Sequence, residues 1–372
     1  MTNNFLKILI TCLFLGLAES GWAQANISGK EALFTEPQRY TTYFAPNPPV
    51  VDGNITEAAW QAAPWTDYFT DIEGDQNPRP TYKTRVKILW NDTCLFLAAE
   101  LEEPQVWATL KKHDAIIYQD NDFEIFIDPD NDTHHYFEIE VNALNTLFDL
   151  YLDKPYRNGG LALIPWRAEG LQSAVQVQGT LNQPQDIDKS WTVEMVIPFR
   201  TMKTGKITTP SDKDFWRINF SRVHWDTSIK NGLYEKITDS QGKPKPEHNW
   251  VWSPQGLINM HFPERWGYLF FSRQPAPKEP AAVFTLPTAE KQKKYLWNIY
   301  YLQKEYYQKH RQYARTLLDL AAPANKLLPP ETSPEIKLEA TTHQFMAYCT
   351  GPDNLTYTIN QDGHLQKLNF KK

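Results

Sequence analysis

The chain has 372 residues, of which 41% are hydrophobic and 22% are charged, a composition that excludes an intrinsically disordered protein. Lysine and arginine number 38 against 44 aspartates and glutamates, and the formal net charge of -6 argues against a nucleic-acid binder. Aromatic residues make up 13% of the chain, which favours either a β-sandwich core or platforms that stack on flat ligands.

Residues 1–25 have the layout of a secretory signal peptide. Lys7 precedes an apolar run at residues 8–17, and Ala23-Gln24-Ala25 supplies a small-x-small cleavage motif. The apolar run, of about 10 residues, is too short to span a bilayer as a helix. No later run reaches membrane length, so we expect no transmembrane anchor. The sequence therefore predicts a protein that is secreted or periplasmic after cleavage near Ala25.

Short alternating apolar runs, separated by Pro, Gly, Asn and Asp, fill the region from Tyr40 to Ser272. About ten strands at this spacing, with little helical periodicity, predict an all-β antiparallel sandwich over residues 35–273. A short helical turn is expected at residues 56–63. The expected strands lie at residues 84–90, 95–101, 123–128, 137–142, 147–152, 175–180, 191–197, 215–222, 251–253 and 266–271.

A proline-rich linker at residues 274–287 precedes a second unit at residues 288–372. Residues 288–320 contain neither Pro nor Gly and repeat apolar residues at helical spacing, which predicts one long helix. Together with the antiparallel sheet that follows, this helix would form a small α+β domain, because each element buries the apolar face of the other. The expected strands of that sheet lie at residues 336–341, 344–349, 355–359 and 365–370. The sequence assigns this domain no function, although its basic helix is a candidate site for a protein partner.

The densest group of polar residues lies in the region from Tyr118 to Asp153. Side chains alternate between the two faces of a strand, so the polar residues of segments 137–142 and 216–220 are expected opposite the core. The residues that this alternation places on the outer face are Glu138, Glu140, Asn142, Arg217 and Asn219. Carboxylates, guanidinium groups and amides on one sheet face are typical of sites for hydroxyl-rich ligands. The alternative is a solvated sheet face that carries ion pairs.

Several segments of the chain match a known family in order and spacing. The matching segments are 51–54, 59–60, 86–90, 95–99, 122–128, 137–142 and 265–269. Through them the sequence, over about residues 40–272, resembles family 9 carbohydrate-binding modules and their bacterial relatives. The resemblance implies a non-catalytic, exported β-sandwich that binds a glycan chain or oligosaccharide in polysaccharide recognition and catabolism.

The resemblance also implies individual binding residues. Members that bind sugar hold its terminal ring between two aromatic rings, with a glutamate and an arginine at the polar edges. Tyr118 and Glu124 match the first ring and the glutamate, whereas Glu140 stands at the arginine position. The second ring falls near residues 260–261, where there is no tryptophan, although Trp250 and Trp252 lie close in sequence. The expected ligand-binding residues are Tyr118, Glu124, Glu138, Glu140, Asn142, Arg217, Asn219, Trp250 and Trp252.

Residues 128–132 carry aspartates at alternate positions, as cation-binding loops do, although the sixth and twelfth positions do not match an EF-hand. Because the family often carries structural calcium, the resemblance implies a calcium site, and no other cofactor is expected. The candidate metal ligands are Asp120, Asp122, Asp128 and Asp130. The alternative is a hairpin turn rich in Asp and Asn. We do not expect His134 and His135 to bind one metal ion, because adjacent strand residues point to opposite faces.

Two other functions compete with carbohydrate binding. Glu138 and Glu140 share a strand face about 7 Å apart, so a hydrolase acting on O-glycosyl bonds is the rival hypothesis. The chain lacks Gly-x-Ser-x-Gly, phosphate-loop and His-Glu-x-x-His motifs, which leaves the two glutamates as the only catalytic signal. The third hypothesis is a structural or assembly module that has no ligand.

Overall fold

The computed structural model describes residues 34–203, 209–277, 284–320, 335–351 and 354–368. The expected signal peptide at residues 1–25 lies outside these ranges. Within them, neither of the two α-helices has the length and apolar character needed to cross a membrane.

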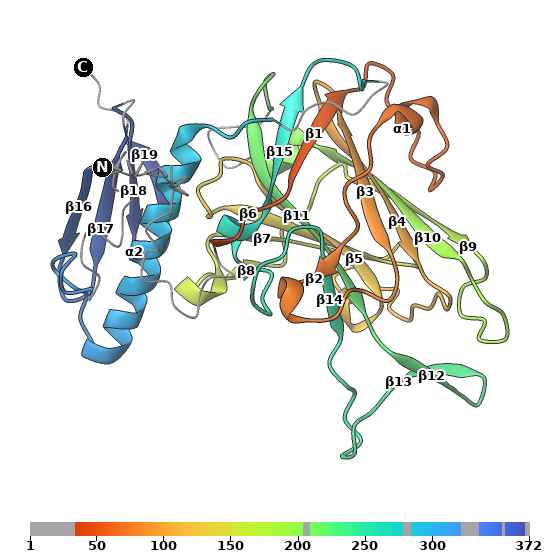
Figure 1. Ribbon diagram of the computed structural model, residues 1–372. Coiled ribbons are helices and arrows are strands. Elements are labelled where there is room, and N and C mark those ends of the chain that lie inside the picture. The colour runs from red at the N-terminus through yellow and green to blue at the C-terminus, as the bar shows by residue number, and fades with distance from the viewer. Residues whose placement is uncertain (1–33, 204–208, 278–283, 321–334, 352–353, 369–372) are drawn as a thin grey trace, which may run out of the picture.

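One large curled sheet dominates the described chain (Figure 1). Its thirteen strands are β1 (Arg39–Phe44), β2 (Thr70–Asp71), β3 (Thr84–Trp90), β4 (Cys94–Glu102), β5 (Asp122–Asp128), β6 (Tyr136–Asn142), β7 (Leu147–Leu152), β8 (Ala162–Leu163), β9 (Gln172–Gln178), β10 (Ser190–Pro198), β11 (Phe215–His224), β14 (His248–Val251) and β15 (Gly267–Ser272). The main path runs β8-β7-β6-β5-β11-β15-β1-β3-β4-β10-β9, and β14 and β2 extend from β11.

The prediction of a purely antiparallel sandwich is wrong. β1 pairs in parallel with β15 on one side and with β3 on the other, so the sheet is mixed. The sheet curls around one core, to which Ile88 of β3, Met195 of β10 and Ile125 of β5 all contribute. Alternation along a strand predicts which face is buried, but it does not predict which neighbour the strand pairs with.

The structure also contains several shorter elements. α1 (Ala58–Ala62) occupies the expected helical turn. A separate hairpin, which the sequence pattern did not predict, consists of β12 (Thr227–Lys230) and β13 (Leu233–Lys236). Single-turn 3₁₀ helices lie at Gly74–Gln76, Ile117–Gln119, Tyr156–Asn158, Phe199–Met202 and Pro263–Arg265.

β5 and β6 are buried on both faces. One face of each strand packs into the main core, which includes Ile125 and Ile139. The other face joins a second apolar cluster in which Phe126 and Tyr136 contact segments from outside the two strands, including Trp266. The alternative of an open, solvated face on these two strands is therefore wrong, and polar side chains on this face are partly enclosed.

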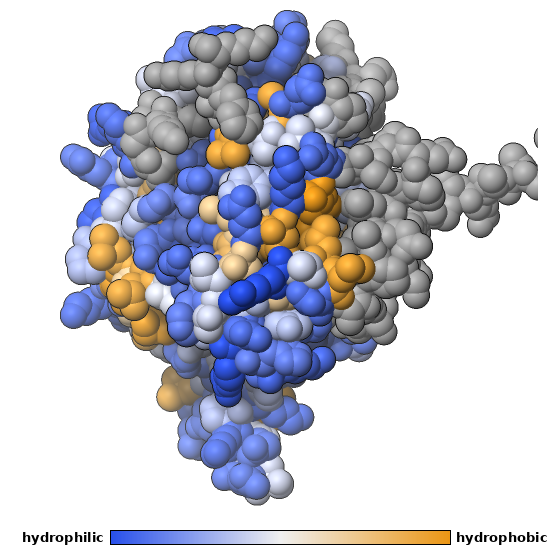
Figure 2. Space-filling view, turned by 90° about the vertical axis from the view of Figure 1, so that its left-hand side faces the viewer, coloured by the Kyte–Doolittle hydropathy of each residue, from blue (hydrophilic) through white to orange (hydrophobic). Residues whose placement is uncertain are grey.

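The small domain contains one helix and a four-stranded antiparallel sheet, as expected. α2 (Thr288–His310) packs against a sheet of order β16-β17-β18-β19. The strands are β16 (Glu335–Ala340), β17 (Phe345–Thr350), β18 (Thr356–Asn360) and β19 (Leu365–Leu368). Figure 1 shows α2 between this small sheet and the large sheet. The face of the molecule on the side of the small domain is largely hydrophilic, with a few hydrophobic patches (Figure 2).

The helix is shorter than predicted. It ends at His310 rather than at residue 320, because Arg311 adopts a left-handed conformation with φ of 57°. The chain then folds back onto the helix, where the side-chain amide of Gln303 bonds both the N–H and the carbonyl of Ala314 at 2.9 Å. This contact joins the helix to the chain that follows it, so the helical periodicity of the sequence does not predict it.

Candidate functional site

A cleft of about 430 Å³ opens over β5 and β6, on the face opposite the main core. The size lies within the range of small-molecule sites. β5, β6 and β7 contribute Glu124, Phe126, Glu138, Glu140, Phe148 and Leu150, and β14 contributes Asn249. The segments that connect the strands contribute Ile116, Tyr118, Tyr156, Asn259 and His261 among others. Among the residues that the structure describes, no lysine or arginine lines it.

The carboxyl groups in the cleft are crowded together by strand register. Glu124 of β5 pairs directly with Glu140 of β6. Carboxylate oxygens of Asp122, Glu124 and Glu140 lie within 4.8 Å of one another. The backbone N–H of Tyr118 donates to Glu140 Oε2 at 3.2 Å. Glu138 Oε2 is buried and makes no hydrogen bond within the described part of the chain.

Burial raises the pKa of every acid in this group. The pKa of Glu124 rises to about 7, because desolvation outweighs the opposing hydrogen bond from Ser221. Desolvation and then the charge of Glu124 raise the pKa of Glu138 to about 8. The pKa values of Asp122 and Glu140 are raised well above the ordinary range, first by desolvation and then by neighbouring carboxylates. Near neutral pH the group therefore retains protons, and it can both donate and accept hydrogen bonds.

Two partly exposed tyrosine rings line the cleft. Tyr118 is 39% exposed and Tyr156 is 44% exposed. The ring of Tyr156 meets the ring of His261 edge to face, with centroids 4.6 Å apart. Burial lowers the pKa of His261 to about 4, so its ring is neutral, and its Nδ1 lies 3.0 Å from the hydroxyl of Tyr136. The cleft thus combines ring faces with carboxyl groups and the side-chain amides of Asn249 and Asn259.

A comparison with known protein families shows to which family this chain belongs. The model of the family described as carbohydrate family 9 binding domain-like matches residues 51–243. The chain belongs to this family. The resemblance found in the sequence is thereby confirmed.

Three solved structures are similar to this family 9-like chain. A candidate carbohydrate-binding protein from Bacteroides uniformis is 16% identical, with a TM-score of 0.48 over 64% of this chain and 100% of its own. A family 9 carbohydrate-binding module from Caldicellulosiruptor kristjanssonii, in complex with cellotriose, is 16% identical, with a TM-score of 0.41 over 67% of this chain and 100% of its own. A module from the same organism, in complex with glucose, is 15% identical, with a TM-score of 0.40 over 65% of this chain and 100% of its own. The search of curated proteins found no match.

Four of the residues expected to bind ligand meet in the cleft of this family 9-like domain. They are Tyr118, Glu124, Glu138 and Glu140. Asn142 does not line the cleft, because its amide donates to Leu110 O at 2.8 Å and to Asp120 Oδ2 at 2.9 Å.

The other four expected residues lie elsewhere, contrary to the idea of one shared face. Arg217 donates to Trp266 O at 2.8 Å and pairs with Glu290 of α2 at 3.3 Å. The amide of Asn219 bonds the backbone of Ser253. Trp250 and Trp252 are buried in the main core. Alternation does turn Arg217 and Asn219 away from that core, but the chain after β14 and α2 covers this part of β11.

Sequence reasoning missed Tyr156 as a residue of the cleft, whereas it placed the second ring position near residues 260–261, and both Met260 and His261 line the cleft. Tyr156 lies in the loop between β7 and β8, where no periodic pattern marks it. Its position between Pro155 and the glycines at 159–160 is the one available signal, because such turn residues place an aromatic side chain on a loop.

The four aspartates proposed as calcium ligands do not form a single site. Asp122 lies with the carboxyl groups of the cleft, whereas Asp128 and Asp130 group with Asp132. Asp120 accepts the backbone N–H groups of residues 109 and 110 at 2.8 Å. Both oxygens of Asp128 accept backbone N–H groups of its own turn, at 3.0 and 2.9 Å. Since Ca²⁺ takes six to eight oxygen ligands, this set of four does not fit one ion, and a structural calcium stays a prediction.

Proposed function

We propose that this chain is an exported, non-catalytic carbohydrate-binding protein that recognises a glycan chain in polysaccharide catabolism. The observation that carries the proposal is the convergence of Tyr118, Tyr156 and the carboxyl group of Glu124 on one cleft, in a chain of this family. A sugar ring has an apolar C–H face and an edge of hydroxyl groups. Tyrosine rings can pack against that face, while carboxyl oxygens accept from the hydroxyls.

The charge of the cleft indicates which sugars it takes. Within the described part of the chain, several carboxyl groups and no lysine or arginine line the cleft. As Glu124 and Glu138 become anionic above about pH 7, a carboxylate on the ligand would meet them at short range, where like charges repel. The preferred ligand is therefore a neutral saccharide rather than one built from uronic acids.

The arrangement of the two glutamates supports binding over hydrolysis. Catalytic carboxyl groups of glycosidases stand about 5 to 9.5 Å apart, on either side of the scissile bond. In this chain Glu138 and Glu140 lie two residues apart on the same strand, β6, so they do not stand on opposite sides of the cleft.

Calorimetry with the full chain tests this function. Neutral oligosaccharides, including gluco-, xylo- and manno-oligosaccharides, are titrated into the protein, and we expect one of them to bind with about −5 to −7 kcal/mol. Glu124→Gln keeps the side-chain shape and should weaken binding by about fivefold or more, because it removes an acceptor. Glu335→Gln, on an exposed side chain of β16, is the matched control.

Two results would contradict the proposal. One is the absence of binding across the whole panel at millimolar ligand. The other is turnover of a chromogenic glycoside by the wild-type chain that Glu138→Gln abolishes, which would support the rival hydrolase.

A further inference from the structure

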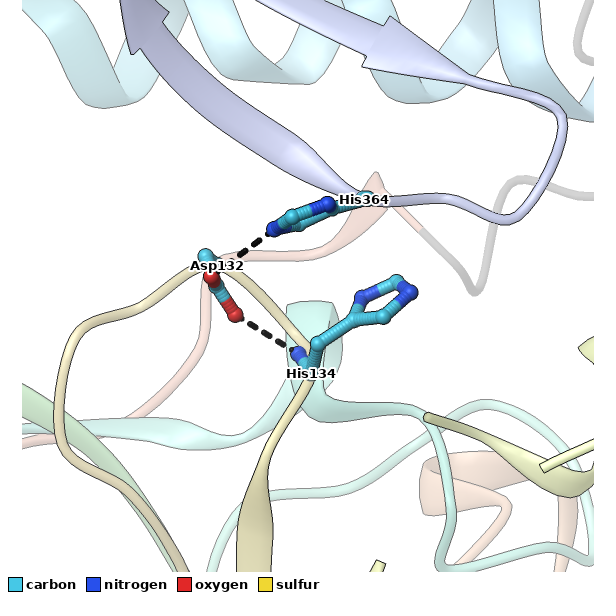
Figure 3. Close-up of side chains that lie close together, drawn as sticks. All are labelled: Asp132, His134 and His364. Atoms are coloured by element: carbon cyan, nitrogen blue, oxygen red, sulfur yellow. Dashed lines mark hydrogen bonds and ion pairs between the residues drawn. The ribbon is translucent and has the colours of Figure 1, made fainter. Parts of the chain in front are cut away.

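Three side chains that commonly bind metals meet where the small domain contacts the large sheet. Asp132 and His134 lie in the turn between β5 and β6, and His364 lies between β18 and β19 (Figure 3). One ligand atom from each residue lies within 4.8 Å of the other two. The two imidazole centroids are 4.4 Å apart, and Asp132 Oδ2 lies 3.0 Å from His364 Nε2. None of the three lines the cleft.

The side chain of His134 has a buried ring nitrogen that makes no hydrogen bond to any residue that the structure describes. The residue is 7% exposed, and this nitrogen is Nδ1. Figure 3 shows the ring directed toward the space beside His364. Buried polar atoms are normally hydrogen-bonded, so an exception calls for an explanation.

The surrounding hydrogen bonds orient the carboxylate of Asp132 and join the two turns that carry the three side chains. Asp132 Oδ1 accepts the backbone N–H of His134 at 2.8 Å, which leaves Oδ2 facing His364. The backbone N–H of Leu365 donates to Asp132 O at 3.2 Å, and Thr133 Oγ1 donates to Gly363 O at 2.8 Å. Oriented ligands of this kind are typical of metal sites.

We propose that Asp132, His134 and His364 bind one divalent transition-metal ion of the Zn²⁺ type. Two imidazole nitrogens and one carboxylate oxygen match the donor preference of Zn²⁺, with the fourth position left to water. Ca²⁺ prefers oxygen ligands alone, so this site differs from the calcium site expected at the aspartates. Because one ligand comes from the small domain and two come from the large sheet, the ion would clip the two domains together.

Titration of the metal-free full chain tests the proposal. Zn²⁺ and Co²⁺ are added separately, and the visible absorption bands of bound Co²⁺ show whether its coordination is tetrahedral. We expect one ion per chain, tetrahedral Co²⁺ bands, and a rise in Tm of a few degrees with Zn²⁺, because a ligand that binds only the folded state stabilises it. His364→Ala and His134→Ala should each weaken binding at least tenfold and abolish the rise in Tm. His343→Ala, in an exposed turn of the same small domain, should change neither.

Each possible result of the titration either supports or overturns the proposed metal site. His364 is partly exposed, so its substitution keeps the test valid even if His134→Ala fails to fold. Unchanged Zn²⁺ affinity in His364→Ala would overturn the proposal, as would binding of Ca²⁺ without any binding of Zn²⁺ or Co²⁺. The readouts do not depend on carbohydrate, so this proposal and the proposed function can fail independently.

Discussion

Glu124 of β5 and Glu140 of β6 lie directly opposite each other in antiparallel register, and both side chains line the same cleft. Like charges at opposed positions destabilise a sheet, and burial adds the cost of desolvation. Such an arrangement is unfavourable for folding alone and is typical of functional sites, where perturbed pKa values cluster. In the proposed function, this cleft binds carbohydrate.

Glu138→Gln should make the stability of the protein less dependent on pH. Burial raises the pKa of Glu138 from 4.5 to about 8, so the folded state retains a proton that the unfolded chain has lost. The stabilisation is fully present below about pH 4.5 and is lost as the pH rises toward about 8. We expect the variant to be more stable than wild type by about 1–3 kcal/mol at about pH 8, with little difference at about pH 4.5. Urea denaturation at both pH values measures this, and an unchanged pH dependence would contradict it.

Tyr156→Ala and Tyr118→Ala should each weaken carbohydrate binding. Removing one ring from the cleft removes stacking worth about 1 kcal/mol, which corresponds to about a fivefold higher Kd. Tyr68 is 46% exposed but does not line the cleft, so Tyr68→Ala is the matched control. Calorimetry with the best ligand of the panel measures all three. Equal losses in Tyr68→Ala would show that the cleft is not the site.

A neutral oligosaccharide should bind more tightly than the same oligosaccharide with a uronic acid unit. The difference should grow with pH, because the pKa of Glu124 is about 7 and that of Glu138 is about 8, and both become anionic as the pH passes these values. We expect a discrimination of about tenfold at about pH 8 that shrinks toward about pH 5. Paired titrations at the two pH values check this. Tighter binding of the uronic acid form would contradict the assignment of ligand charge.

Glu290→Ala should destabilise the contact between α2 and the large sheet. Glu290 is 4% exposed and pairs with Arg217, and its Oε2 also accepts the hydroxyl of Tyr268 at 2.9 Å. Without Glu290, the buried guanidinium group of Arg217 loses its anionic partner, which costs about 3–5 kcal/mol. Chemical unfolding followed by tryptophan fluorescence measures the loss. In the control Glu335→Ala, the exposed ion pair with Lys337 is removed, and we expect a loss below about 1 kcal/mol.

Much of the cleft could be predicted because it depends on local pattern. Alternation along β6 places Ile139 in the core and turns Glu138 and Glu140 to the opposite face, as the structure confirms. The small domain was equally predictable, since uninterrupted helical periodicity and four short alternating runs describe α2 and its sheet. Period-2 and period-3.6 patterns are properties of neighbouring residues, so they can be read without the fold.

Contacts between distant segments were decided by the tertiary structure. The parallel pairing of β1, the approach of Tyr156 to His261, and the pairing of Arg217 with Glu290 each join residues far apart in the chain. His134 lies together with Asp132 and with His364 of the other domain, a grouping that residue order alone does not show. Residue order alone determined the family, most strands of the large sheet and the carboxyl groups of β6. The packing of the curled sheet decided which loops and which domain cover those strands. Packing energy depends on shape in three dimensions and not on the spacing of residues along the chain.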